Sequence, residues 1–351
     1  MPSPAEMLLH KNIAGWNVVS ELGTYPGMTG GTFSTGYVVE KSGRKAFMKA
    51  MDLQRAFLKG VKSVQALINQ YVFEKEVLDF CRDRRLSGIV NLYDSGQHDS
   101  AGDGNPANII YYLIFELADG DIRRELTASG FKDNFWKLSV LHQSANALVQ
   151  LHSIDIAHQD IKPSNILSFE QNNKFKLADL GRCNSKKIVA PTDEASIPGD
   201  PSYSPPEYQY GASPVSYIDK RLGNDAYLLG SLIAFLFADG AGALIATLSY
   251  LPNDIWPGQW EGEFVDALPF LITAHTQATI ALKKKFPNEI RDELAEAYFY
   301  LCHPDPALRG HPNARRQTGR PLGVDRYRSI FDRLRQKIRI HDRINRRNKD
   351  A

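Results

Sequence analysis

The sequence is poor in cysteine, nearly neutral in net charge and free of long hydrophobic runs. Its 351 residues include only three cysteines, Cys81, Cys183 and Cys302, which are far apart and nowhere spaced as CxxC. This pattern argues against a disulfide framework or a zinc site and favours a reducing compartment such as the cytoplasm. With a net charge of +2, the molecule is not expected to bind polyanions through bulk charge, so any basic binding surface must be local.

No stretch of the chain is typical of a membrane or export segment. Apolar residues are densest at 227–237 and 241–251, but Asp239 and Gly240 separate the two stretches. Each is too short to cross about 30 Å of hydrocarbon, so we expect no membrane span and interpret the region as a buried core helix. The first ten residues lack a cationic region followed by an apolar run, so no signal peptide is expected.

The N-terminal third is strand-rich. Residues 1–15 show no clear pattern and are expected to be an extension. Strand-like stretches at 16–22, 37–39 and 45–50 predict three antiparallel strands, with a glycine-rich loop between the first two. A helix is predicted over 64–84 and two more strands at 89–93 and 109–116, which together give a five-stranded sheet. No GxxxxGK[ST] is present, and this order of elements disfavours a Rossmann or P-loop fold.

After residue 120 the pattern becomes mainly helical. A long amphipathic helix is predicted over 136–152, followed by a short hairpin within 166–178 and an irregular segment over 182–206. From 315 to 349 basic residues dominate, with apolar residues at helical spacing. We interpret this end as a final helix with a solvated basic face. The alternative is a docking surface for an acidic partner or nucleic acid.

One loop carries the chemistry. The stretch His-Gln-Asp-Ile-Lys-Pro-Ser-Asn at 158–165 places a carboxylate, a lysine and an amide within eight residues. Asp160 can accept a proton from a hydroxyl, Lys162 can neutralise a phosphate, and Asn165 can offer its carbonyl oxygen to a divalent cation. These groups suit the transfer of a phosphoryl group to an alcohol, where positioning and charge neutralisation do most of the catalysis.

The loop resembles the catalytic loop H-R-D-x-x-x-x-N of protein kinases, with Gln159 in place of the arginine. Further elements resemble that family in the same order along the chain. They are Lys49 in a strand, Glu74 in the following helix, Asp179-Leu180-Gly181, the segment Gly199 to Glu207, Asp225 to Gly230, and Asp305 to Arg309. The chain is therefore similar to the eukaryotic-type protein kinase superfamily, and Lys162 resembles its serine/threonine branch.

This resemblance implies a two-lobed α+β protein kinase fold. The expected divisions are an N-terminal extension at 1–15, an N-lobe at 16–118, a C-lobe at 119–314 and a basic helical tail at 315–351. The N-lobe would hold a small antiparallel sheet and one main helix, and the larger C-lobe would be mainly helical. The implied activity is transfer of the γ-phosphoryl group of ATP, with Mg²⁺, to serine or threonine hydroxyls of proteins.

The resemblance also implies a role for each polar residue of the site. Lys49, paired with Glu74, would orient the phosphates, and Glu76 is the alternative partner. Asn165 and Asp179 would hold Mg²⁺. Asp160 would orient the acceptor hydroxyl and take its proton, and Lys162 would stabilise the transferring group. Two structural roles are implied as well: a Glu207–Arg309 ion pair, and hydrogen bonds from Asp225 to the catalytic loop.

The nucleotide side of the site departs from the family pattern. Gly23, Gly30 and Gly31 belong to a glycine-rich loop that is longer than usual and does not follow G-x-G-x-x-G. Gly36 stands where the family has a valine over the adenine, and Phe47 stands where it has an alanine. We interpret the pair as a compensating swap; an error in the strand register is the alternative. The hinge is expected at Phe115, Glu116, Leu117 and Ala118, and Asp119 or Asp121 is expected at the ribose.

Two further departures bear on regulation and charge. Glutamine at 159 cannot pair charge-to-charge with a phosphate on the 182–206 segment. We therefore expect activity to depend little on phosphorylation of Ser185, Thr192, Ser196 or Ser202. Asp200 replaces a common threonine, and we expect its negative charge near Asp160 to raise the pKa of one of the two carboxylates.

Two other functions remain open. A pseudokinase, acting as a nucleotide-regulated scaffold, would explain the unusual loop and Gln159, but it would not need Lys49, Asp160, Asn165 and Asp179 together. A small-molecule kinase would share the Asp160 loop, but such kinases lack the elements at 199–207 and 305–309. The sequence thus favours a protein kinase.

Overall fold

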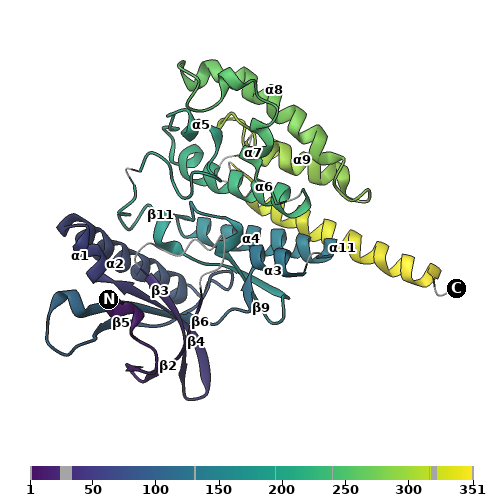
Figure 1. Ribbon diagram of the computed structural model, residues 1–351. Helices are drawn as coiled ribbons and strands as arrows, with labels where there is room; N and C mark the ends of the chain where they lie inside the picture. Colours follow the sequence, from purple (N-terminus) through teal and green to yellow (C-terminus); the bar gives the residue numbers. More distant parts are fainter. Residues whose placement is uncertain are drawn as a thin grey trace.

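The chain folds into two lobes, one built on a β-sheet and one mainly helical (Figure 1). The computed structural model describes residues 2–23, 34–129, 132–193, 195–238, 240–315, 317 and 322–349. The sheet lobe (N-lobe) runs through the end of β6, and the helical lobe (C-lobe) follows it. The two-lobed α+β architecture predicted from the sequence is confirmed.

The N-lobe sheet has six strands among the described residues, in the order β1-β2-β3-β4-β6-β5, all antiparallel. The prediction of five strands was wrong, because residues 12–13 form an extra edge strand paired with β2. The strands are β1 (Asn12–Ile13), β2 (Trp16–Glu21), β3 (Ser34–Lys41), β4 (Arg44–Asp52), β5 (Leu92–Asp99) and β6 (Ile109–Glu116).

The alternation of side chains along β4 gives the sheet two different faces. Ala46, Met48 and Ala50 point into a cluster formed with the N-terminal segment. Phe47 and Met51 point to the other face and pack in the main core, where α1 (Leu53–Leu58) and α2 (Val61–Asp83) cover the sheet. Residue 49 therefore faces α2 rather than solvent.

The first residues of the chain are an integral part of the N-lobe. A short 3-10 turn, Pro4–Glu6, lies on the sheet, and Ala5 and Leu8 are fully buried there. The hydroxyl of Tyr37 donates to the carbonyl of Ala5 at 2.7 Å, and Glu6 pairs with Arg55. The segment that we expected to be a plain extension thus supplies the cover of one sheet face.

The C-lobe is organised around two buried helices, α4 (Asn134–Ser153) and α6 (Gly223–Phe237). Every residue of α6 is buried, including Asp225, as the core-helix interpretation of 227–237 requires. No helix in the described ranges is long and apolar enough to cross a membrane. The other helices are α3 (Ile122–Ser129), α5 (Pro206–Gln209), α7 (Ala243–Leu248), α8 (Phe264–Lys283), α9 (Arg291–Leu301), α10 (Pro312–Arg315) and α11 (Val324–Lys349).

Short strands of the C-lobe fix the loops that face the N-lobe. A three-stranded sheet has the order β10-β9-β7, and a two-stranded pair joins β8 to β11. The pair β8–β11 ties the start of the irregular 182–206 segment to the start of the Asp160 loop. These strands are β7 (Gly120–Asp121), β8 (Ile156–Ala157), β9 (Ile166–Phe169), β10 (Lys174–Leu177) and β11 (Asn184–Ser185).

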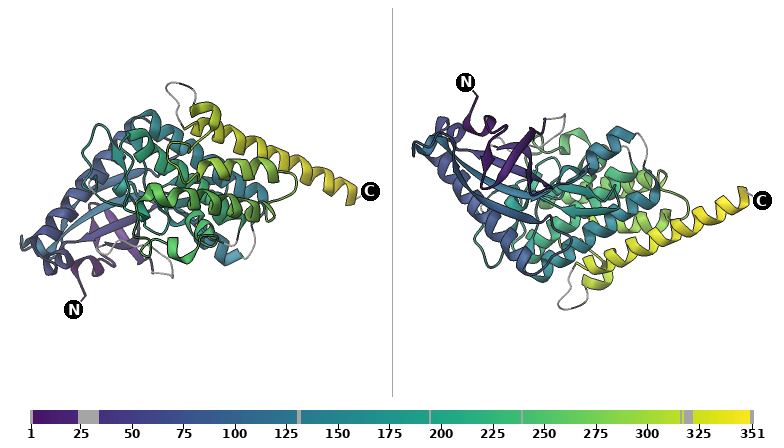
Figure 2. Two further views of the ribbon diagram at one scale, coloured as in Figure 1. Left: turned by 90° about the horizontal axis from the view of Figure 1, so that it is seen from above. Right: turned by 90° about the horizontal axis from the view of Figure 1, so that it is seen from below.

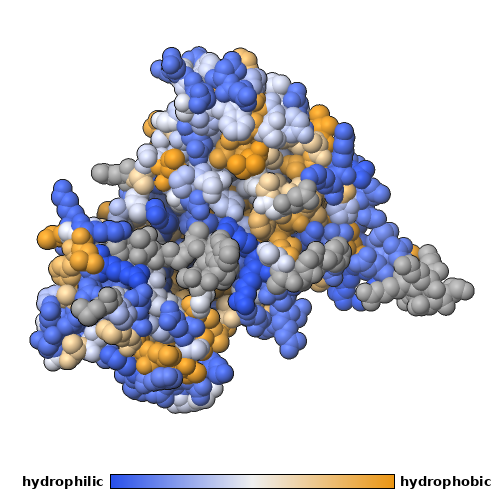
Figure 3. Space-filling view, in the orientation of Figure 1, coloured by the Kyte–Doolittle hydropathy of each residue, from blue (hydrophilic) through white to orange (hydrophobic). Residues whose placement is uncertain are grey.

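The basic C-terminal region is a helix of the C-lobe for most of its length. Phe331, Leu334 and Ile338 of α11 are buried and pack along α4, while the end of α11 projects from the body (Figure 2). In the same view as Figure 1, the coloured part of α11 that leaves the body is mostly hydrophilic (Figure 3). The packing supports the lobe-helix interpretation. An acidic partner or nucleic acid for the basic face stays a prediction of the sequence alone.

Candidate active site

Lys49 and Glu74 meet between the sheet and α2. Lys49 Nζ lies 3.0 Å from Glu74 Oε2 and 3.5 Å from Asp179 Oδ1. Glu74 is buried on the sheet face of α2 together with Phe73 and Val77. The alternative partner, Glu76, lies on the exposed face of the same helix. One cation thus faces two carboxylates, one from each lobe.

The charges of this cluster respond to burial and to each other. Burial alone would lower the pKa of Lys49, but Glu74 and Asp179 outweigh it, and the net pKa is raised. Burial raises the pKa of Glu74, whereas the ammonium of Lys49 lowers the pKa of Asp179. The two carboxylates differ because burial outweighs the attraction of Lys49 at Glu74, whereas at Asp179 the attraction of Lys49, helped by His158 and Lys162, outweighs burial. Asp179 is therefore the carboxylate that stays ionised for a cation.

The Asp160 loop (158–165) is anchored to α6 through Asp225. The carboxylate of Asp225 accepts hydrogen bonds from the backbone nitrogens of His158 at 2.8 Å and Gln159 at 2.7 Å. Gln159 adopts a left-handed backbone conformation with φ 68°. His158 Nε2 lies 3.1 Å from the carbonyl oxygen of Ala178, next to Asp179. The loop and the Asp179 turn are thereby held at a fixed separation.

Asp160 is held in one orientation by three neighbours. Asn165 Nδ2 donates to Asp160 Oδ2 at 3.0 Å, the backbone nitrogen of Asp200 donates to Oδ1 at 3.0 Å, and Lys162 Nζ lies 3.2 Å from Oδ2. Burial raises the pKa of Asp160, against the opposing effect of Lys162. A raised pKa makes the carboxylate a better proton acceptor, as a general base requires.

The expected repulsion between Asp160 and Asp200 does not occur. Lys162 Nζ lies 3.2 Å from a carboxylate oxygen of each residue and so separates the two charges. The pKa of Asp160 rises because of burial, with Asp179 rather than Asp200 as the like charge. Although burial opposes it, the pKa of Asp200 is lowered, because Ser202 and Lys162 stabilise its charged form. The carboxylate at 200 therefore shares Lys162 instead of disturbing Asp160.

Gly199 brings the 182–206 segment against the Asp160 loop. It adopts φ +71°, and a Cβ added there would lie 2.3 Å from the carbonyl oxygen of Gln159 and 3.0 Å from Asp160 Oδ1. Only glycine fits both the backbone conformation and this close approach. The contact holds the amide of Asp200 in place to donate to Asp160.

Gly36, Phe47 and Phe115 lie together on the face of the sheet that carries Lys49. In the strand register Gly36 pairs with Lys49, and Phe47 pairs with Phe115. The two phenyl rings are 6.2 Å apart and inclined by 24°. A Cβ added at Gly36 would lie 2.9 Å from Cε2 of Phe47. This geometry supports the swap interpretation over an error in register.

The remaining residues expected at the nucleotide differ in how much the structure constrains them. Gly30 and Gly31 lie outside the described residues, and a Cβ at Gly23 would meet no atom within 4 Å. Glu116 Oε1 accepts from the backbone nitrogen of Asn91 and pairs with Lys176, so its side chain braces the strand after which Leu117 and Ala118 follow. Asp121 is buried and caps α3 by accepting from the nitrogen of Arg124. Asp119 instead accepts from the nitrogen of Gln171.

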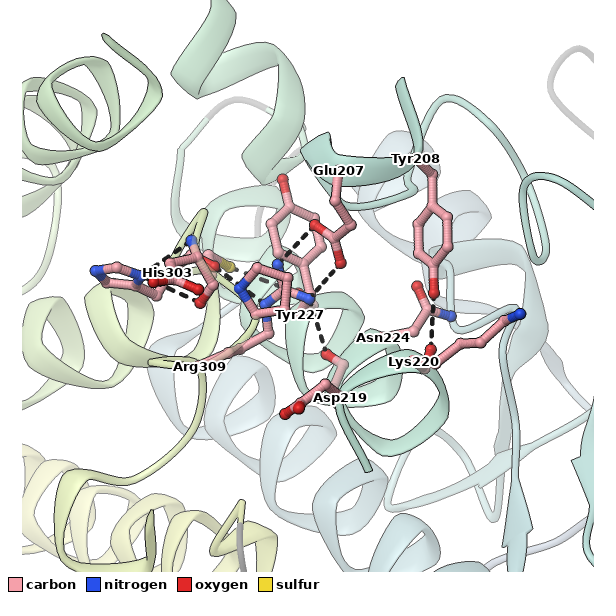
Figure 4. A network of polar contacts seen from close by, with 12 residues as sticks. Glu207, Tyr208, Asp219, Lys220, Asn224, Tyr227, His303 and Arg309 are labelled. Atoms are coloured by element: carbon pink, nitrogen blue, oxygen red, sulfur yellow. Dashed lines mark hydrogen bonds and ion pairs between the residues drawn. The ribbon is translucent and has the colours of Figure 1, made fainter. Parts of the chain in front are cut away.

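A buried ion pair braces the C-lobe below the 182–206 segment (Figure 4). Arg309 Nη1 and Nη2 each lie 2.8 Å from an oxygen of Glu207, and both side chains are fully buried. The guanidinium also stacks over the ring of Tyr227, with its carbon 5.1 Å from the ring centroid. Since Glu207 lies in the first turn of α5, directly after the segment, this pair fixes the position where the segment ends.

Two residues of the site, Arg221 and Asp193, were not predicted from the sequence. Arg221 belongs to a π-helical turn, Ile218–Leu222, and its guanidinium contacts Asp193 and Gln159. Neither residue lies in a recurrent motif. The only signal in the sequence was the unexplained glutamine at 159, whose neutral amide needs partners once buried.

The polar groups fit a divalent cation and its phosphate ligands. Asn165 Nδ2 donates to both the carbonyl and the carboxylate of Asp160, which sets the amide orientation and leaves its carbonyl oxygen for a cation. Asp179, in a left-handed conformation, offers a carboxylate from the facing turn. Oxygen ligands of this kind suit Mg²⁺, which keeps further sites for water and phosphate. Within the described ranges no group of three His, Cys, Asp or Glu side chains forms a metal site by itself.

Comparison with known proteins places the whole arrangement in a family. The protein kinase domain model matches residues 27–238. The serine/threonine-protein kinase PrkC of Bacillus subtilis is 30% identical over 169 residues, covering 46% of this chain and 24% of PrkC. PknA of Mycobacterium tuberculosis is 30% identical over 146 residues, covering 41% and 31%, and greatwall of Gallus gallus is 28% identical over 186 residues, covering 52% and 19%.

The alignments thus span no more than about a third of the length of these relatives. The family model, in contrast, covers more than half of this chain and includes both the Lys49 strand and the Asp179 turn. Six of the seven predicted elements lie within the matched residues, and only the element at 305–309 follows them. The chain belongs to the protein kinase family.

Proposed function

We propose that this chain transfers the γ-phosphoryl group of ATP to serine or threonine hydroxyls of proteins. The observation that carries the proposal is the joint placement of Lys49, Asp160, Asn165 and Asp179, each held by partners that the reaction needs and folding alone does not. Its relatives PrkC, PknA and greatwall are named serine/threonine-protein kinases.

In this proposal each lobe has a separate task. Lys49, kept charged by Glu74 and Asp179, orients the phosphates of ATP in the cleft. Phe47, beside Gly36, covers the adenine, and the backbone at 116–118 hydrogen-bonds it. When bound, Mg²⁺ neutralises the phosphate oxygens. Asn165 and Asp179 are the residues that would hold it.

The transfer step itself falls to the Asp160 loop. Asp160 accepts a hydrogen bond from the acceptor hydroxyl and takes its proton as the hydroxyl oxygen bonds to the γ-phosphorus, while the bond from that phosphorus to the β,γ-bridging oxygen breaks and ADP leaves. Its raised pKa suits this task, and the amides of Asn165 and Asp200 keep its oxygens in place. Lys162, 3.2 Å from Asp160, supplies a positive charge beside the transferring group.

A protein acceptor is favoured by segment 199–207, which begins next to Asp160. Segment 199–207 runs from the Gly199 contact to the buried Glu207–Arg309 pair. A segment held at both of these points gives an extended peptide a fixed surface beside the base.

The three cysteines are buried and unpaired, which fits action in a reducing compartment, the cytoplasm.

The test is transfer of labelled phosphate from ATP, with Mg²⁺, to generic protein substrates, beside Asp160→Asn as the matched control. Label on serine or threonine that disappears in the variant supports the proposal. ATP binding without transfer would instead identify a nucleotide-regulated scaffold, and transfer restricted to small alcohols would identify a small-molecule kinase.

A further inference from the structure

Arg221 connects the Asp160 loop to the middle of the 182–206 segment. Its side chain is 8% exposed and extends from the π-helical turn before α6. Nη2 donates to the carbonyl oxygen of Asp193 at 2.9 Å and lies 3.4 Å from Asp193 Oδ1. Nη1 donates to Gln159 Oε1 at 3.4 Å. The guanidinium of Arg221 therefore contacts both the carboxylate of Asp193 and the side chain of Gln159, the residue next to Asp160.

Gln159 suits this place because it is neutral and can both donate and accept. Its Nε2 donates to the carbonyl oxygen of Arg221 at 2.8 Å and to Asp225 Oδ1 at 3.1 Å, while its Oε1 accepts from the guanidinium. A second cation at this position would lie close to Arg221 in a buried site and repel it. The residues at 159 and 221 are thus complementary.

The carboxylate of Asp193 holds the first half of the 182–206 segment at two points. One carboxylate oxygen accepts from the side chain of Asn184, which lies in β11 beside β8. The other accepts from the backbone nitrogen of Ala190 at 3.3 Å. The carboxylate closes residues 184–193 into a compact loop, and Arg221 ties that loop to Gln159. Each of these contacts is made by a side chain that the sequence encodes, and none of them needs a phosphate group.

We propose that Arg221 and Asp193 are positioning residues for phosphoryl transfer. Their ion pair holds the 184–193 loop against Gln159 and thereby keeps Asp160 in its transfer-competent orientation. The proposal rests on the kinase function proposed above. It adds how the activity is controlled: the carboxylate of Asp193, which the sequence encodes, orders the segment. Ser185 agrees with this, since its side chain is buried and accepts from the nitrogens of Lys187 and Ile188.

The test compares Arg221→Met, Asp193→Asn and the double variant of the full chain with Asp155→Asn. The first two remove one charge of the pair at similar side-chain size. Asp155→Asn removes exposed ion pairs to Lys186 and Lys187 in the same segment. We expect kcat to fall about tenfold or more in the three pair variants, with no added loss in the double variant. KM for ATP should stay within about twofold of wild type. Arg221→Lys should recover part of kcat, and the control should match wild type.

Hydrogen exchange supplies a readout that needs no activity. Amides at 184–193 should exchange faster in Asp193→Asn, while those of α4 keep their protection. Wild-type kcat with unchanged exchange in Asp193→Asn would overturn the proposal, as would additive losses in the double variant or an equal fall of kcat and ATP affinity. Failure of the kinase function itself would appear separately, as no Asp160-dependent transfer by the wild-type chain.

Discussion

Replacing Gly36 by valine should expel ATP by moving the ring of Phe47. The added Cβ would lie 2.9 Å from Cε2 and 3.4 Å from Cζ of that ring. Ordinary carbon contacts are about 3.5–4.0 Å, so the ring must move by several tenths of an ångström even before the two methyl groups are placed. The ring of Phe115 lies 6.2 Å from that of Phe47 between centroids, so it limits the directions in which Phe47 can move.

The expected size follows from the cost of overpacking. Extra methyl groups in a packed site cost about 1–3 kcal/mol. If this cost falls on the bound state, the Kd for ATP rises about 5- to 150-fold. Titration calorimetry with ATP and Mg²⁺ measures this change directly.

Two further variants make the reasoning specific. Combining Gly36→Val with Phe47→Ala moves the bulk back across the strand pair and should restore the Kd to within about threefold of wild type. Thr35→Val is the matched control, since Thr35 pairs with Ala50 on the opposite face of the sheet. An unchanged Kd in Gly36→Val, or a double variant as weak as the single one, would refute the packing argument.

Three other predictions concern the base, the brace and the segment. Asp160→Asn should lower kcat by about 10²–10⁴-fold with ATP affinity retained. Burial raises the pKa of Asp160, and the base acts when it is ionised. In a pH–rate profile, wild-type kcat/KM should therefore rise with pH through a value above the usual aspartate range. Glu207→Gln leaves Arg309 buried without its charge partner and should cost about 3–5 kcal/mol of stability, seen in denaturation of the C-lobe; an unchanged midpoint would contradict it. Alanine at Thr192 and Ser196 should leave kcat near that of wild type, and a large loss would show that phosphorylation controls the segment after all.

The parts of the site that sequence reasoning found are those encoded by short motifs. Lys49 and Glu74 were predicted as partners because a lysine in an apolar strand needs a carboxylate and the resemblance to protein kinases implied Glu74. Glu207 and Arg309 were predicted 102 residues apart, since both belong to motifs whose order was visible. In each case a local pattern was enough to name the residue.

The parts that it missed depend on contacts without a local pattern. Arg221 and Asp193 meet only because the π-helical turn and the 182–206 segment fold onto the same loop. The position of Lys162 between Asp160 and Asp200 reversed an expectation drawn from charge alone. Ala5 and Leu8 are buried against strands that are formed later in the chain, so their role becomes visible only when the sheet is assembled.

The covered N-lobe sheet has a consequence for how the cleft opens. A sheet with one bare face can twist and flex, whereas this one is packed between α2 and the residues around Pro4–Glu6. The N-lobe should therefore move as a rigid block, and the bending should concentrate in the connection at 117–119. The rate of nucleotide exchange would then depend more on the flexibility of residues 117–119 than on bending of the N-lobe sheet.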